Sequence, residues 1–207
     1  MPELDLIPRK QPQQTRSRET MQRVLEEAEA LLVEQGVDGF NTNILAERAG
    51  VGVRAIYRYF PNKWAILVEL VDRSYARERE WVGHLGSLKP GDDWRSATDR
   101  MIDRFFAGAS ASPSYAVLRA ACQVSPQLRD VEARNIARFE RDVAATLAAL
   151  GMPADPRRLR VMAQIVIDVS GRLIDLALNA DDRAEAELLL GELKRMLHDL
   201  LGPHLPG

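Results

Sequence analysis

The sequence predicts an all-α fold in which a small N-terminal bundle of three helices precedes a larger helical bundle. Helix-forming Ala, Leu, Glu and Arg recur along the whole chain, whereas runs of β-branched residues are few. Apolar residues return every three or four positions through most of the 207 residues, as on one face of a helix. Clusters of Gly and Pro separate these periodic stretches and mark the turns. A hydrophobic content of 46% with 28% charged residues is ordinary for a globular protein.

The beginning of the chain contains three prolines and no apolar periodicity, so residues 1–15 are expected to form a mobile tail. Two interpretations of this tail stay open. It is either disordered without a function or a basic arm that reaches nucleic acid through Arg9, Lys10 and Arg16.

A first helix is expected over 17–35. Met21, Leu25 and Leu32 recur there at helical spacing and define its buried face. Gly36 is expected to end it, because glycine tolerates the backbone conformation that closes a helix.

Two short helices joined by a tight turn follow. Asn41 is placed to cap the first by accepting a backbone N–H, and Phe40 before it is placed to pack against Leu45. Gly50 stands where the chain turns, and the second helix buries Ile56. Two helices can cross closely here, because Ala46 is small, Gly50 follows four positions later and the aliphatic Ile56 follows six positions after that. This spacing is typical of a DNA-binding helix-turn-helix, whose second helix enters the major groove.

The same segment carries a family signature. Residues 49–63 read Ala-Gly-Val-x-x-x-x-Ile-Tyr-x-Tyr-Phe-Pro-x-Lys, which resembles the signature of the tetracycline-repressor (TetR-like) family of bacterial transcription regulators. The resemblance extends over about 16–70 and implies a helix-turn-helix DNA-binding domain at 16–62. The chain departs from the family at Gly52 and Ala55, where hydroxyl side chains are common, and at Arg54, where a small residue is common.

The second short helix is expected to face the DNA. Arg54 and Arg58 are predicted to read bases, because arginine bonds bidentately to guanine. The resemblance implies phosphate contacts for the two tyrosines and for Thr42 and Lys63. The candidate DNA-binding residues are Thr42, Val53, Arg54, Tyr57, Arg58, Tyr59 and Lys63.

Charge is segregated in this half of the chain, although the formal net charge of the whole protein is only −2. Residues 9–18 hold four cations and no acid, and residues 48–63 hold four more and no acid. The acids lie mainly on the intervening helix. This segregation indicates a surface that faces phosphates.

A long helix over 63–82 is expected to connect the two domains. Pro61 ends the preceding helix and Asn62 caps this one. Lys63 in its first turn opposes the helix dipole, which favours a phosphate contact over the alternative of a solvated lysine. The helix contains no Gly or Pro and would act as a stiff lever, and the Gly- and Pro-rich stretch 83–93 follows it.

Residues 83–207 are predicted to form a helical domain for effector binding and dimerisation, with helices over 94–109, 115–123 and 125–150. The family resemblance implies a small molecule that binds within 94–180 and releases the DNA. The candidate lining is mainly apolar, which favours a hydrophobic or aromatic effector, although each side chain also suits an ordinary core. The candidates are Trp81, Met101, Phe105, Tyr115, Arg119, Cys122, Phe139 and Met162.

The last two helices carry apolar residues in alternating steps of three and four, like a coiled-coil seam. Two such helices from each of two subunits would make a four-helix interface about a twofold axis. Ser170 and Gly171 favour this over the alternative of an internal core, because small residues permit close approach. The candidate interface residues are Met162, Val166, Val169, Leu173, Leu176, Leu189, Leu193 and Met196.

Catalytic and metal-binding motifs do not occur: the chain has no Gly-rich phosphate loop, no His/Cys cluster and no Gly-x-Ser-x-Gly. The sequence therefore predicts no enzyme, no cofactor and no metal. A single cysteine, the absence of a signal peptide and the lack of a membrane-spanning stretch favour a cytoplasmic location.

The function that these features predict is a homodimeric repressor that binds a palindromic double-stranded DNA operator and is released by a small-molecule effector. The alternative is a DNA-binding dimer without any effector, whose helical domain serves only assembly or protein contacts.

Overall fold

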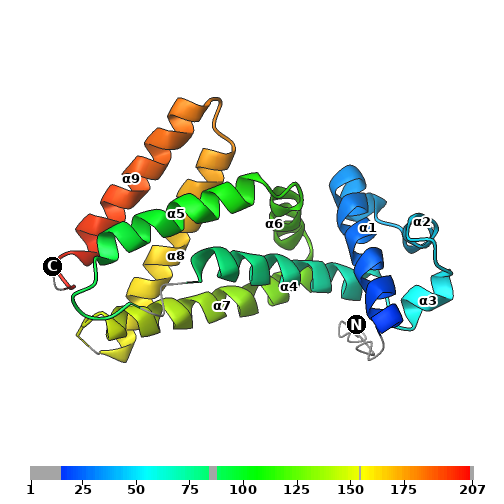
Figure 1. Ribbon diagram of the computed structural model, residues 1–207, viewed down its shortest axis with the longest axis horizontal. Coiled ribbons are helices and arrows are strands. Elements are labelled where there is room, and N and C mark those ends of the chain that lie inside the picture. The colour runs from blue at the N-terminus through cyan, green and yellow to red at the C-terminus, as the bar shows by residue number, and fades with distance from the viewer. Residues whose placement is uncertain (1–14, 84–87, 154, 206–207) are drawn as a thin grey trace. The chain divides into compact units, whose positions relative to one another are not determined.

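The computed structural model describes residues 15–83, 88–153 and 155–205, and within these ranges the chain forms helices and no strands (Figure 1). The helices are α1 (Thr15–Gly39), α2 (Thr42–Arg48), α3 (Val53–Tyr57), α4 (Lys63–Val82), α5 (Trp94–Ser110), α6 (Ser114–Val124), α7 (Pro126–Ala149), α8 (Pro156–Leu178) and α9 (Arg183–Leu201). The predicted all-α fold is confirmed. Except for Thr15, which begins α1, the predicted tail over 1–15 lies outside the described residues.

α1 supports the N-terminal bundle through one apolar face. Met21, Leu25 and Leu32 are buried on this face, as their spacing predicts. The regular helix ends at Gly36, whose φ of 65° and ψ of −174° suit glycine far better than a residue with a side chain. One further turn reaches Gly39.

The turn signals of α2 to α4 form as predicted. Asn41 Oδ1 accepts the N–H of Asn43 at 2.8 Å, and Gly50 adopts a φ of 62° in the turn that leads to α3. Asn62 Oδ1 accepts the N–H of Ala65 at 3.0 Å at the start of α4. These local hydrogen bonds set where each helix begins, because they satisfy backbone donors that the helix cannot satisfy itself.

The described residues divide into two compact units. The first combines the chain up to Tyr75 with Pro113–Ala133, and the second combines Ala76–Ser112 with the chain from Arg134 onward. α4 and α7 each continue from one unit into the other. This division differs from the predicted domain boundary at 82/83, because α6 packs against α1 and so joins the N-terminal bundle.

The second unit has its core between α5, α8 and α9, which pack against one another. α8 and α9 lie side by side in Figure 1. Ile102 of α5 and Leu193 of α9 are fully buried in this core, and Leu147 near the end of α7 and Leu150 just after that helix also belong to it.

Candidate nucleic-acid interface

α3 has one buried and one exposed face. Ile56 is buried against the bundle and anchors the helix, whereas Arg54, Tyr57 and Arg58 are exposed. Val53 at the start of the helix is half-buried. The buried aliphatic residue therefore orients the helix so that two cations and a phenol face outward.

Side-chain contacts hold part of this outward face in place. The hydroxyl groups of Thr42 on α2 and Tyr57 on α3 lie 3.0 Å apart and share a hydrogen bond. The Arg58 guanidinium lies over the Tyr59 ring, with Cζ 4.9 Å from the ring centroid, and its Nη2 donates to the Tyr59 hydroxyl at 2.8 Å. The structure thus brings Thr42 and Tyr57 together, and likewise Arg58 and Tyr59.

Tyr59 differs from the other predicted contact residues. Only 5% of it is exposed, so its ring belongs to the core of the bundle and its hydroxyl is the end that meets Arg58. The phosphate contact that the resemblance implies for Tyr59 stays a prediction, and only the hydroxyl end of its buried ring could make it.

Lys63 lies at the start of α4, half-buried. Its Nζ donates to the carbonyl oxygen of Val37 at 3.5 Å and lies 5.1 Å from the centroid of the Trp64 ring. The ammonium group has three donors, so this single long hydrogen bond leaves it able to bind a phosphate.

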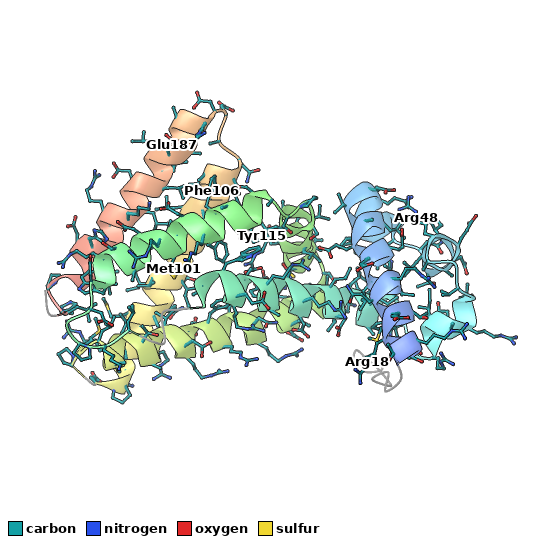
Figure 2. The ribbon with its side chains drawn as sticks, in the orientation of Figure 1. Arg18, Arg48, Met101, Phe106, Tyr115 and Glu187 are labelled. Carbon is teal, nitrogen blue, oxygen red and sulfur yellow. The ribbon has the colours of Figure 1, made fainter. Side chains whose placement is uncertain are left out.

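An ion pair that the sequence analysis missed lies beside the interface. Arg48 at the end of α2, labelled in Figure 2, donates from Nη1 and Nη2 to the two carboxylate oxygens of Glu34 at 3.0 and 2.5 Å. These hydrogen bonds hold the pKa of Glu34 below its ordinary value and raise the pKa of Arg48. The charge of Arg48 is therefore paired with a carboxylate, which reduces what this cation contributes to a phosphate-facing surface.

The eight candidate effector residues are divided between the two units. Tyr115, Arg119 and Cys122 belong to the first unit, and the other five belong to the second. Cys122 is buried and free of any disulfide.

In the first unit, Arg119 forms a cluster of contacts. Its Cζ lies 4.5 Å from the Tyr75 ring centroid and 5.2 Å from that of Tyr115, which is labelled on α6 in Figure 2. It also forms an ion pair with Glu132 at 3.5 Å. The cluster joins α4, α6 and α7 within that unit.

In the second unit, Trp81 meets Phe105 edge to face with ring centroids 5.5 Å apart. Trp81 also lies so close to Gly108 that a Cβ there would be 2.4 Å from the indole. A nearby groove of about 330 Å³ between the end of α4 and α7 is lined by Phe139, Arg79 and Asp142 among others. Trp81, Met101, Phe105 and Met162 are not part of its lining.

The candidate interface residues fall on different sides of α8 and α9. Met162, Val166 and Leu193 are buried in the core of the second unit, which corrects their assignment to a seam between two chains. Leu176 and Met196 are exposed. The remaining three, Val169, Leu173 and Leu189, are half-buried at the edge of that core.

Apolar residues outside the predicted seam share the exposed side. Val161 and Ile165 lie on the same side of α8 as Leu176, and Leu188 lies on the same side of α9 as Met196. We call these five residues the outer apolar residues. Leu188 is the most exposed of the five, at 65%.

A three-helix bundle that buries the inner face of α3 and exposes its basic outer face defines a DNA-binding protein of the helix-turn-helix class. Comparison with known families agrees. A family model described as bacterial regulatory proteins, tetR family, matches residues 24–70. A second, described as the tetracyclin repressor-like C-terminal domain, matches residues 92–205. The chain belongs to the TetR family of transcriptional regulators, as its signature predicts.

Two curated relatives match part of the chain. The chain is 43% identical over 74 residues, 35% of its length, to the tetracycline repressor protein class A from transposon 1721 of Escherichia coli. It is 36% identical over 84 residues, 41% of its length, to the HTH-type transcriptional repressor KstR of Rhodococcus jostii. The matched segments span 32% and 36% of these relatives, about a third of each.

Solved structures extend the similarity of fold to nearly the whole chain. A TetR-family transcriptional regulator from Streptomyces coelicolor is 25% identical, with 90% of this chain and 98% of that one covered at a TM-score of 0.66. A Mesorhizobium loti protein described as a TetR-family regulator is 17% identical, with 93% and 100% covered at a TM-score of 0.73.

No helix among the described residues is long and apolar enough to cross a membrane. Over the same residues, no group of three or more His, Cys, Asp or Glu side chains is placed to hold a metal ion.

Proposed function

We propose that the protein is a homodimeric transcriptional repressor that inserts α3 of each subunit into successive major grooves of a palindromic operator. The observation that carries this proposal is the exposed basic face of α3, backed by the buried Ile56. Both curated relatives are named as repressors, which supports the direction of regulation. Such a protein acts where bacterial DNA lies, in the cytoplasm.

The base-reading residue of this proposal is Arg54, which is exposed in the first turn of α3 and can bond bidentately to guanine. Val53 beside it supplies apolar contact suited to a thymine methyl group. Thr42, Tyr57 and Lys63 contact phosphates from the flanks of the helix.

The test uses an operator selected from random duplex DNA with the full-length protein. Arg54→Ala should relax preference at one position per half-site, which corresponds to about 1–3 kcal/mol of discrimination. Lys63→Ala should weaken binding to all sequences alike and reduce the salt slope. If both variants bound as the unchanged protein does, α3 would not be the reading helix.

The proposed dimer interface consists of the outer apolar residues of α8 and α9, which a four-helix contact would cover. Gly171 and Gly191 support it. Both are exposed within helices, and a Cβ at either position would meet nothing within 4 Å of the same subunit. A glycine within a helix costs about 1 kcal/mol relative to alanine. Close approach by a partner helix would explain why glycine stands at these two positions despite that cost.

The dimer is tested by charge substitution on the exposed side alone. Leu188→Glu with Met196→Glu should give monomers in analytical ultracentrifugation and, through lost bivalency, much weaker operator binding. The fold of each subunit should survive, because neither side chain is buried. A double variant that remained dimeric would exclude this surface as the interface.

The second part of the proposal is release by a small hydrophobic or aromatic effector. α4 supports it, because this helix runs unbroken from Lys63, beside the DNA-binding face, into the second unit, where Trp81 meets Phe105. A ligand that prefers one position of α4 must change operator affinity, and operator must change ligand affinity by the same factor.

The effector is sought with a panel of aromatic and hydrophobic compounds that displace labelled operator. Ala76→Gly with Arg77→Gly loosens α4 where it passes between units without removing a buried side chain. This variant should bind DNA and compound yet lose their coupling. If no compound altered tryptophan fluorescence or operator binding, the alternative of a DNA-binding dimer without effector would stand.

A further inference from the structure

The geometry points to different roles for two neighbouring arginines: Arg54 within α3 reads bases, whereas Arg58, the C-cap residue of α3 that Tyr59 holds, contacts the DNA backbone. This inference rests on the proposed operator binding and sharpens it. It replaces the sequence-based expectation that both arginines read bases and that Tyr59 itself contacts a phosphate.

The first step is the position of each arginine along α3. Arg54 is the second residue of the helix, and Arg58 is the C-cap residue after its last turn. Four residues at a helical rise of 1.5 Å separate them by about 6 Å along the axis. Recognition helices contact base edges with their N-terminal residues, so Arg54 stands where bases are read and Arg58 stands toward the far end.

The second step is the anchoring of Arg58. Its guanidinium lies on the Tyr59 ring, 4.9 Å from Cζ to centroid, and Nη2 donates to the phenol oxygen at 2.8 Å. Tyr59 is only 5% exposed, so the ring that carries the guanidinium is fixed in the core of the bundle. An extended reach to the groove floor would break both contacts at once.

The third step is what the anchored group can bind. A guanidinium has five N–H donors, and the contact with Tyr59 uses one of them. Its exposed donors keep the planar fork that pairs two N–H groups with two oxygens of a phosphate. Arg58 is itself exposed, so this fork faces solvent beside the helix rather than the interior.

Arg54 is different in each respect. It is exposed, and among the residues that the structure describes its side chain has no hydrogen-bond or ion-pair partner. Its side chain is free to extend and to adjust to a base pair. Tyr59 is thus a positioning residue for Arg58, and the two arginines differ because only one of them has a buried aromatic neighbour to hold it.

The experiment measures dissociation constants against salt concentration for the operator selected from random DNA and for its single-base variants. Arg58→Ala should weaken binding to every sequence by a similar factor, on the order of tenfold, and reduce the salt slope by about one unit per recognition helix. Base preferences should stay unchanged. Arg58→Lys, which keeps the charge but loses the fork and the stacking, should give an intermediate loss.

A double-mutant cycle then tests Tyr59. Tyr59→Phe removes the hydroxyl and keeps the ring, and it should weaken operator binding about threefold to tenfold. In the Arg58→Ala background the same change should have almost no effect, because the group that it positions is already gone. Thermal unfolding of both variants separates this result from a loss of fold.

Three outcomes are decisive. If Arg58→Ala changed the preference at one base pair and left the salt slope intact, Arg58 would be a base reader and the inference would fail. If Tyr59→Phe weakened binding equally in both backgrounds, Tyr59 would act independently of Arg58. If the unchanged protein selected no operator and bound DNA without salt dependence, the proposed function itself would fail, a result distinct from the other two.

Discussion

The N-terminal bundle and the α8–α9 pair use apolar periodicity in different ways. On α3, the buried Ile56 and the exposed Arg54 differ in chemistry, so the polarity of each residue tells which way it faces. On α9, Leu193 is fully buried and Met196 is 47% exposed, yet both are apolar and only three residues apart. A helix with apolar residues on two sides does not reveal from its sequence which side is the core and which awaits a partner.

The largest expected effect tests the bundle side of this comparison. Phe60 is fully buried there, and Phe60→Ala should cost about 3–5 kcal/mol through lost transfer energy and an unfilled cavity. Hydrogen exchange should show α1 to α3 opening and operator binding lost, while α8 and α9 stay protected. Tyr57→Ala, at an exposed position, is the matched control and should weaken DNA binding without opening the helices. Equal loss of protection in both regions would mean that the two units unfold as one.

The next effect tests the two sides of α9. Leu193→Ala should destabilise the subunit by about 2–5 kcal/mol, whereas Met196→Ala should change its stability by less than about 0.5 kcal/mol. Denaturation is followed at protein concentrations low enough to keep the chain monomeric. Only the Met196 change should weaken association at high concentration. Similar unfolding midpoints for the two variants would contradict the assignment of core and outer sides.

A smaller effect distinguishes the two sides by its sign. Gly171→Ala and Gly191→Ala should each stabilise the isolated subunit by up to about 1 kcal/mol, because alanine is the better helix former and space is open around both positions. If partner helices approach these glycines, the same substitutions should weaken dimerisation. Sedimentation and monomer denaturation measure the two changes separately. Stabilisation of both monomer and dimer would show that these glycines lie outside the interface.

The smallest effect concerns the ion pair beside α3. The hydrogen bonds from Arg48 hold the pKa of Glu34 below its ordinary value of 4.5. A lowered folded-state pKa stabilises the fold at pH values above that ordinary value, and the stabilisation is lost as pH falls through the folded pKa. The free energy of unfolding of Glu34→Gln should therefore fall slightly less than that of the unchanged protein as the pH is lowered below about 5. NMR titration of Glu34 checks the direction. An unshifted titration would mean that the pair does not persist in solution.

Sequence alone determined the helical class, the family and, to within one residue, the ends of α4, α5, α6 and α7. Asn41, Asn62 and Gly50 act through hydrogen bonds and backbone conformations that involve only near neighbours in the chain. α4 spans the predicted 63–82 for the same reason. Such signals are local, so they can be recognised from the sequence without a structure.

Tertiary structure decided what depends on contacts between distant residues. The pairing of Arg48 with Glu34, fourteen positions away, follows no helical period. Only packing buries the Tyr59 ring and so turns its hydroxyl into a support for Arg58. The joining of α6 to the N-terminal bundle likewise arises from its packing on α1. The apolar periodicity of a helix shows that one of its faces is apolar. Which surface covers that face depends on how the helices pack, because burial is a property of both surfaces in contact.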